Sequence, residues 1–140
     1  MTTGGLRADH FELPPNVFEN TATFIETVRQ RIPGKIVRHA VELLGDRDLL
    51  ARVLGTTARN LGRFYRKESL SRKHSEAVLE TLRLYLETLR VWDSAEAARG
   101  WLNSRVPALN GEEPTNLFDT SEGRRWVRQV LQAIESGEFS

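Results

Sequence analysis

The chain has 140 residues, of which 39% are hydrophobic and 28% are charged, and it carries a formal net charge of +1. This composition is that of an average soluble globular protein and argues against a disordered or fibrous chain. The lack of cysteine excludes disulfides and thiolate-ligated metal sites. No stretch reaches the roughly 18 apolar residues that span a bilayer, and a secretory signal pattern is missing, so we expect a cytoplasmic protein with no membrane partner.

Basic residues are concentrated in one segment of the chain. Eight basic and two acidic residues lie between Arg47 and Lys73, and the rest of the sequence is net acidic. Such a segment is typical of a surface that binds a polyanion, although charges that merely solvate helix faces explain the run equally well.

The first 20 residues contain glycine and proline pairs without a sustained period, and they are interpreted as a flexible arm. From Thr21 to Ile32 the apolar residues recur at helical spacing. Asn20 or Thr21 is the predicted N-cap of this helix, and Pro33 with the following glycine is its predicted stop.

A second helical pattern runs over residues 36–44 and ends at Gly45, a residue that readily takes a left-handed conformation. Asp46 then caps a short helix. The predicted buried side of this short helix consists of Leu49, Leu50, Val53 and Leu54.

Gly55 turns the chain sharply, and Thr56 or Thr57 is the predicted cap of another helix that runs to about Arg66. Two short helices joined by a glycine-containing turn, the second of them basic, predict a helix-turn-helix. Arginine and asparagine read guanine and adenine in the major groove, whereas threonine, lysine and helix N-termini hold phosphates. The predicted base readers are Arg59, Asn60 and Arg63, and the predicted phosphate contacts are Thr56, Thr57, Arg66 and Lys67. A helical hairpin with a solvated basic face is the structural alternative.

The longest predicted helix begins after Ser71 and extends to about Asp93. Its apolar residues are spaced by three and four, so it is expected to form core between the two halves, or in part a seam between two copies of the chain. A homodimer suits DNA binding because paired recognition helices meet half-sites one turn apart.

Beyond Ser94 we expect a helix to Leu102, a structured loop over residues 103–114 and a last helix over residues 121–136. This part of the sequence contains an ordered pattern of apolar, proline, glycine and polar residues. The pattern consists of Ala98, Trp101, Leu102, Pro107, Ala108, Leu109, Asn110, Gly111, Pro114, Leu117, Phe118, Asp119, Thr120, Gly123, Val127, Leu131, Ile134, Glu135 and Gly137.

That pattern resembles the C-terminal toxin-binding domain of Xre/MbcA/ParS antitoxins, in which it likewise follows a divergent Xre-like helix-turn-helix. The resemblance covers about residues 34–137. It departs from the family at Ala133, where an arginine is frequent, and at Glu138-Phe139, where an apolar pair is common.

The resemblance implies an antitoxin whose C-terminal region covers the active site of a RES-domain toxin that consumes NAD, and which represses its own operon. It implies contacts with the toxin from the loop, the last helix and the tail. These residues are Leu109, Asn110, Gly111, Arg124, Arg128, Glu135, Gly137, Glu138 and Phe139.

Together these observations predict an all-α protein: an arm over residues 1–20, a helix-turn-helix domain over 21–70, a connecting helix over 71–93 and a toxin-binding domain over 94–140. No catalytic site, cofactor or metal site is expected, since the three histidines are far apart and no phosphate-binding glycine loop occurs. Two alternatives stay open: a stand-alone helix-turn-helix repressor, and an adaptor that does not bind DNA.

Overall fold

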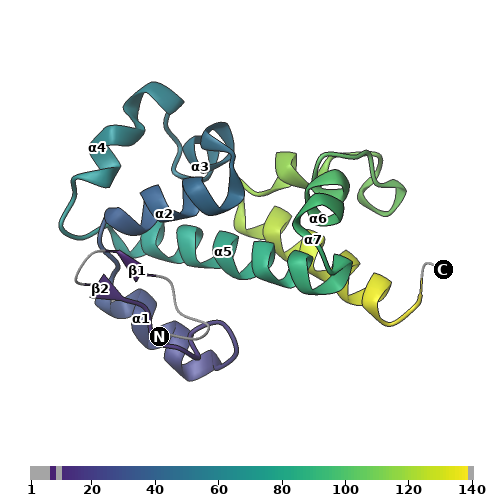
Figure 1. Cartoon of the computed structure of the whole chain (residues 1–140), viewed down its shortest axis with the longest axis horizontal. Helices are drawn as coiled ribbons and strands as arrows, with labels where there is room; N and C mark the ends of the chain where they lie inside the picture. The colour runs from purple at the N-terminus through teal and green to yellow at the C-terminus, as the bar shows by residue number, and fades with distance from the viewer. Residues whose placement is uncertain (1–6, 9–10, 139–140) are drawn as a thin grey trace. The chain divides into compact units, whose positions relative to one another are not determined.

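The computed structural model describes residues 7–8 and 11–138, and it is predominantly helical, which confirms the predicted all-α class. Two short strands, β1 (Arg7–Ala8) and β2 (Phe11–Glu12), pair antiparallel near the N-terminus. The chain folds as two compact units, unit 1 over residues 1–79 and unit 2 over residues 80–140. Helix α5 (Arg72–Trp92) contributes residues to both of them (Figure 1). In the described part of the chain, no helix is both long and apolar enough to traverse a bilayer.

Unit 1 is built from short helices whose ends follow local sequence signals. Asn20 accepts a hydrogen bond from the Thr23 N–H at 2.9 Å, and Asp46 accepts one from the Leu49 N–H at 3.0 Å, so both are N-caps. Gly45 ends the second helix in the left-handed conformation, at φ 69°. The helices before α5 are α1 (Thr21–Gln30), α2 (Lys35–Leu44), α3 (Arg47–Val53), the 3₁₀ helix η1 (Ala58–Asn60) and α4 (Leu61–Tyr65).

Helix α1 ends earlier than the sequence predicted, at Gln30 rather than beside Pro33. Arg31 takes a positive φ of 67°, and Ile32 then enters the core with no exposed surface. The Ile32 N–H donates to the hydroxyl of the buried Ser75 in α5 at 3.0 Å. This tertiary hydrogen bond takes the place of a helical one, and the sequence around residue 32 carries no sign of it.

The predicted flexible arm is wrong for the segment from Leu13 to Val17. Both of these side chains are fully buried, and the Val17 N–H donates to the Pro14 carbonyl at 3.1 Å, which closes a turn. Two apolar residues are too few to show a period, so only the core they enter reveals their role. Residues 1–6 and 9–10 lie outside the described part of the chain.

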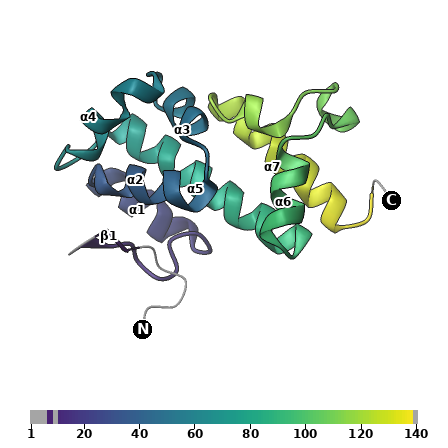
Figure 2. The ribbon, with the colours of Figure 1, turned by 45° about the horizontal axis from the view of Figure 1, so that its top comes forward.

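Unit 2 is formed by the C-terminal half of α5 and the elements that follow it (Figure 2). These are α6 (Ala95–Leu102), the 3₁₀ helices η2 (Pro107–Leu109) and η3 (Pro114–Leu117), and α7 (Ser121–Glu135). Ser94 caps α6 and Thr120 caps α7 through their hydroxyl groups. The core of the unit contains Ala98, Leu109, Phe118, Val127 and Leu131, none of which is more than 1% exposed.

Candidate functional site

The segment that carries the predicted DNA contacts lies in unit 1, after α3. Gly55 turns the chain at φ 69°, as predicted. The four residues expected on the buried side of α3 are buried, and so is Ala51, which the sequence analysis did not include. The next helix is not continuous, however, because η1 precedes a five-residue α4. Neither Thr56 nor Thr57 caps it through its side chain: Thr57 holds the N-cap position without a side-chain hydrogen bond.

The tight first turn of this segment has an identifiable cause. The Arg47 guanidinium of α3 donates to the Ala58 carbonyl at 2.9 Å, and this ties the start of η1 to α3. Gly62, a poor helix former, follows within α4. A methyl group at Gly62 would meet only the end of the Arg66 side chain, at 3.5 Å, so close helix packing does not require this glycine.

The basic side chains of this segment point away from the core. Leu61 is fully buried, and Phe64 and Tyr65 are half-buried, so these residues form the core-facing side of the helix. Thr57 is exposed, and Thr56 and Asn60 are half-buried. Four cations of this segment are exposed, and they are called here the basic surface: Arg59, Arg63, Arg66 and Lys67.

Aromatic rings support the side chains around the basic surface. The Lys67 ammonium lies 5.9 Å from the centre of the Phe64 ring, and the Arg38 guanidinium lies 5.9 Å from that of Tyr65. His74 of α5 and Phe64 form a T-shaped pair, with 5.3 Å between their ring centres. Partial burial, and then the charges of Lys73 and Lys67, lower the pKa of His74 below its usual 6.5.

In unit 2, the predicted loop is a compact structure held by backbone hydrogen bonds. The Val106 N–H donates to the Glu112 backbone carbonyl at 3.1 Å, and the Gly111 N–H donates to the Val106 carbonyl at 3.0 Å. Asn110 and Gly111 both adopt positive φ, 58° and 79°, and both are exposed at the tip. Leu109, in contrast, is fully buried, so its side chain anchors the loop and is not available at the surface.

Three arginine–glutamate pairs join α5 and α7 within unit 2. Arg124 is 8% exposed; its Nε donates to Glu80 at 2.7 Å and its Nη1 to the Phe118 carbonyl at 2.7 Å. Arg128 contacts one oxygen of Glu87 through two nitrogens, each at 3.1 Å. Arg90 pairs with Glu135 at the exposed end of the same two helices.

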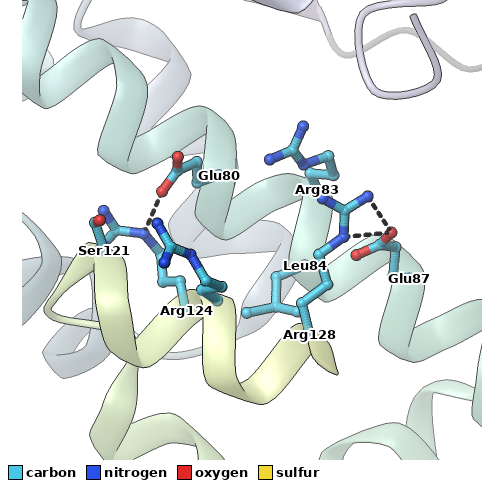
Figure 3. Close-up of a pocket in the computed structure, with 8 residues that line it drawn as sticks. Glu80, Arg83, Leu84, Glu87, Ser121, Arg124 and Arg128 are labelled. Carbon is cyan, nitrogen blue, oxygen red and sulfur yellow. Dashed lines mark hydrogen bonds and ion pairs between the residues drawn. The ribbon is translucent and has the colours of Figure 1, made fainter. Parts of the chain in front are cut away.

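A pocket of about 160 Å³ opens between these two helices (Figure 3). The first two ion pairs form part of its wall. Its lining consists of Glu80, Arg83, Leu84, Glu87, Ser121, Arg124, Arg125 and Arg128.

The C-terminal end of α7 closes in a glycine turn. Gly137 has a φ of 83°, and the Glu138 N–H donates to the Ala133 carbonyl at 2.9 Å, a hydrogen bond typical of such helix ends. Glu135, Gly137 and Glu138 are exposed, whereas Phe139 lies outside the described residues.

The structure therefore divides the predicted toxin contacts into separate places. Asn110 and Gly111 are at the loop tip, Glu135 to Glu138 are at the end of α7, and Arg124 and Arg128 are engaged with carboxylates of α5. The sequence analysis missed those carboxylates. A signal was present, because Glu80 and Glu87 are seven residues apart and Arg124 and Arg128 are four apart, which places each pair on one helix face.

No group of three or more histidine, aspartate or glutamate side chains suited to a metal ion occurs among residues 7–8 and 11–138. His39 and His74 lie in different helices of unit 1, and His10 is among the residues left undescribed.

Comparison with known proteins gives a family match and a similar protein. Residues 88–137 match the family model described as the antitoxin Xre/MbcA/ParS C-terminal toxin-binding domain. A segment of 49 residues is 41% identical to the "Prs ADP-ribosylating antitoxin" of Sphingobium sp. (strain YBL2). That segment is 35% of this chain and 31% of the relative, so the chain spans about a third of the length of the protein it matches.

Proposed function

We propose that the chain is the antitoxin of a type II toxin–antitoxin system, because residues 88–137 match the Xre/MbcA/ParS C-terminal toxin-binding domain that the sequence pattern resembles. Its partner is a RES-domain toxin that consumes NAD, and unit 2 neutralises the toxin by covering the active site. The match over residues 88–137 carries this proposal. The name of the relative associates an antitoxin with ADP-ribosylation, a reaction that uses NAD, which supports this class of toxin. The chain itself acts by binding and catalyses no reaction.

Two exposed places of unit 2 are suited to the toxin. The tip formed by Asn110 and Gly111 presents backbone groups in a fixed left-handed conformation, so little order is lost when it is bound. The end of α7 presents Glu138, whose charge is attracted to a cationic nucleotide-binding cleft, beside Glu135, which pairs with Arg90 in the free chain. Leu109 and Arg124 support these places from inside the unit, because both are buried. Arg128, half-buried against Glu87, has the same supporting role in the free chain.

Coexpression with the product of an adjacent gene, expected to encode a RES-domain protein, tests the proposal. We expect the wild-type chain to rescue growth and to copurify with the toxin. The variant Glu135→Lys/Glu138→Lys should weaken the complex because it reverses two exposed charges on the proposed contact surface. Glu19→Lys/Glu26→Lys is the matched control, since it reverses two exposed charges in unit 1. Growth that is equally good with the toxin alone, or a toxin that never copurifies, contradicts the proposal.

We further propose that unit 1 binds operator DNA as a homodimer and represses the operon of the chain. The observation that supports this is the basic surface of Arg59, Arg63, Arg66 and Lys67 on a short helix after a glycine turn. Arginines on a helix that enters the major groove are the commonest base readers. The stand-alone repressor predicts promoter binding and no toxin partner, whereas the adaptor predicts no mobility shift of promoter DNA. A gel-shift titration at two salt concentrations, with and without the toxin, distinguishes the three hypotheses: the antitoxin, the stand-alone repressor and the adaptor.

A further inference from the structure

Two tryptophans of unit 2 stack against each other where α5 gives way to α6. Trp92 is the last residue of α5 and Trp101 lies in α6. Their ring centres are 6.0 Å apart, their planes are tilted by 33°, and both residues are only half-buried. Together with the exposed Ala97 and Gly100 of α6 they are called here the tryptophan face. We propose that the toxin packs against the tryptophan face, an inference that rests on the proposed function.

The tryptophan face continues along α6 across two small residues. Ala97 lies four residues before Trp101 and three before Gly100, and residues at these spacings are neighbours on a helix surface. Ala98 and Leu102 are buried and hold the other side of α6 against the core. A partner can therefore reach the helix backbone at Gly100 and contact Trp101 at the same time.

Gly100 is not required by the fold of the chain. It lies inside α6, where glycine is less favourable than alanine, and it does not adopt a positive φ. Its chain neighbours and own helix backbone aside, no atom of the described residues lies within 4 Å of the position that a Cβ would take. A glycine that the fold does not need is explained when another molecule comes close to the backbone there.

Trp92 is also a costly residue for the chain alone. Its indole Nε1 is buried and has no hydrogen-bond partner within the described part of the chain, which lowers stability. Phenylalanine at this position would bury no such donor. Because Nε1 is buried, the surface that the half-buried side chain exposes is carbon. An exposed apolar face of tryptophan is typical of the residues that contribute most to protein–protein binding.

The family match indicates that the occupant is the toxin. The match to a toxin-binding domain begins at residue 88, within α5, and therefore includes the whole tryptophan face. Residues that lower the stability of the chain are expected where it binds a partner, and Trp92 and Gly100 are two such residues on one face. The exposed Glu96, four residues before Gly100, adds a negative charge at the edge, which suits the cationic cleft proposed for the toxin.

The experiment measures toxin affinity and thermal unfolding for full-length chains substituted at Gly100. The probe is the RES-domain protein that copurifies with the wild-type chain. Gly100→Ala should raise the unfolding midpoint and yet weaken toxin binding about threefold or more. Gly100→Gln places a longer side chain at the same spot and should weaken toxin binding about tenfold or more. A glycine without a role in binding would give the change in the midpoint alone.

Ala95→Gln is the matched control for Gly100→Gln. Ala95 is exposed in the same helix, and its distance of five residues from Gly100 places it on another side of α6. This variant should change toxin affinity less than about twofold, because it adds the same side chain outside the tryptophan face.

Trp92→Phe tests the second position of the face. It removes the unpartnered N–H and keeps an aromatic ring, so the unfolding midpoint should be unchanged or higher. Toxin binding should weaken about threefold or more because apolar contact surface is lost. Circular dichroism verifies that each variant folds. In case one does not, the indole and amide chemical shifts of the labelled wild-type chain should change at Trp92, Gly100 and Trp101 when unlabelled toxin is added.

Toxin affinity that is the same for Gly100→Gln and Ala95→Gln overturns the inference and leaves the proposed function intact. Chemical shifts that change only outside residues 92–101 do the same. If Gly100→Gln alters the molar mass of the free chain and leaves toxin affinity unchanged, the face belongs to a second copy of the chain and the inference is wrong. A wild-type chain that binds no toxin contradicts both the inference and the proposed function.

Discussion

The two units use arginine in opposite ways. In unit 1, the basic surface holds Arg59, Arg63 and Arg66 out in solvent on a short helix. In unit 2, Arg124 and Arg128 point inward and connect α7 to carboxylates of α5. The same residue type is thus a candidate contact for a polyanion in one unit and an internal connection in the other. The number of charges along the sequence does not distinguish these two roles of arginine. The role depends on whether a carboxylate from another helix lies close to the guanidinium.

The largest effect is expected where an internal arginine is removed. Arg124→Ala should lower the free energy of unfolding by about 3–5 kcal/mol, because it leaves Glu80 with an unpaired charge and the Phe118 carbonyl without its donor. Arg125→Ala is the control, since its pair with Glu122 is exposed and contributes less than about 1 kcal/mol. Urea unfolding of both variants measures the difference. Similar losses in the two would mean that the inward arginine is not a structural connection.

A second comparison concerns glycines at which neighbouring backbone comes close. A methyl group at Gly34 would lie 1.8 Å from the Phe64 carbonyl oxygen, so Gly34→Ala must push α4 away from the start of α2. We expect a loss of about 1–3 kcal/mol or more, and with it a displaced basic surface. Gly100→Ala in α6 has no atom within 4 Å and should gain about 0.5–1 kcal/mol. Thermal unfolding of the two variants checks the opposite signs, and a stabilising Gly34→Ala would contradict the close approach.

The basic surface is tested by neutralising one outward arginine. Arg63→Gln should weaken specific operator binding by about 1–3 kcal/mol if the side chain reads a base, and should leave the unfolding midpoint unchanged because the residue is exposed. Arg29→Gln, exposed in α1, is the matched control. Fluorescence anisotropy with operator and scrambled duplexes measures both affinities. A parallel loss on both duplexes would reassign Arg63 to phosphate contact.

The smallest expected effect is a dependence of unit 1 on pH. The pKa of His74 is lowered in the folded chain. At pH values between 6.5 and that lower pKa, the unfolded chain therefore binds a proton at this side chain that the folded chain does not bind. Stability should therefore fall as the pH drops below about 6.5 and level off below the folded pKa. His74→Gln should flatten this part of the profile. Urea midpoints of the two chains between about pH 8 and about pH 5 measure it, and identical slopes would rule out His74 as the source.

Local signals in the sequence determined where several helices begin and end. Asn20, Asp46 and Ser94 accept hydrogen bonds from the N–H three residues on, and Gly45 and Gly55 adopt positive φ. These features depend on a few consecutive residues, so they can be read without knowing the fold. The C-terminal pattern from Ala98 to Gly137 was equally readable, and it lies within the residues 88–137 that match the family model.

Only the tertiary structure decided which of the named residues reach the surface. Leu109 and Asn110 are neighbours in the loop, yet one is fully buried and the other exposed. Arg124 is turned inward by Glu80, 44 positions away, and Val17 is buried although its segment shows no period. Burial and ion pairing depend on distant residues that meet in space. A sequence read along one dimension specifies caps and turns, and the packing of the whole unit determines which side chains remain free to bind.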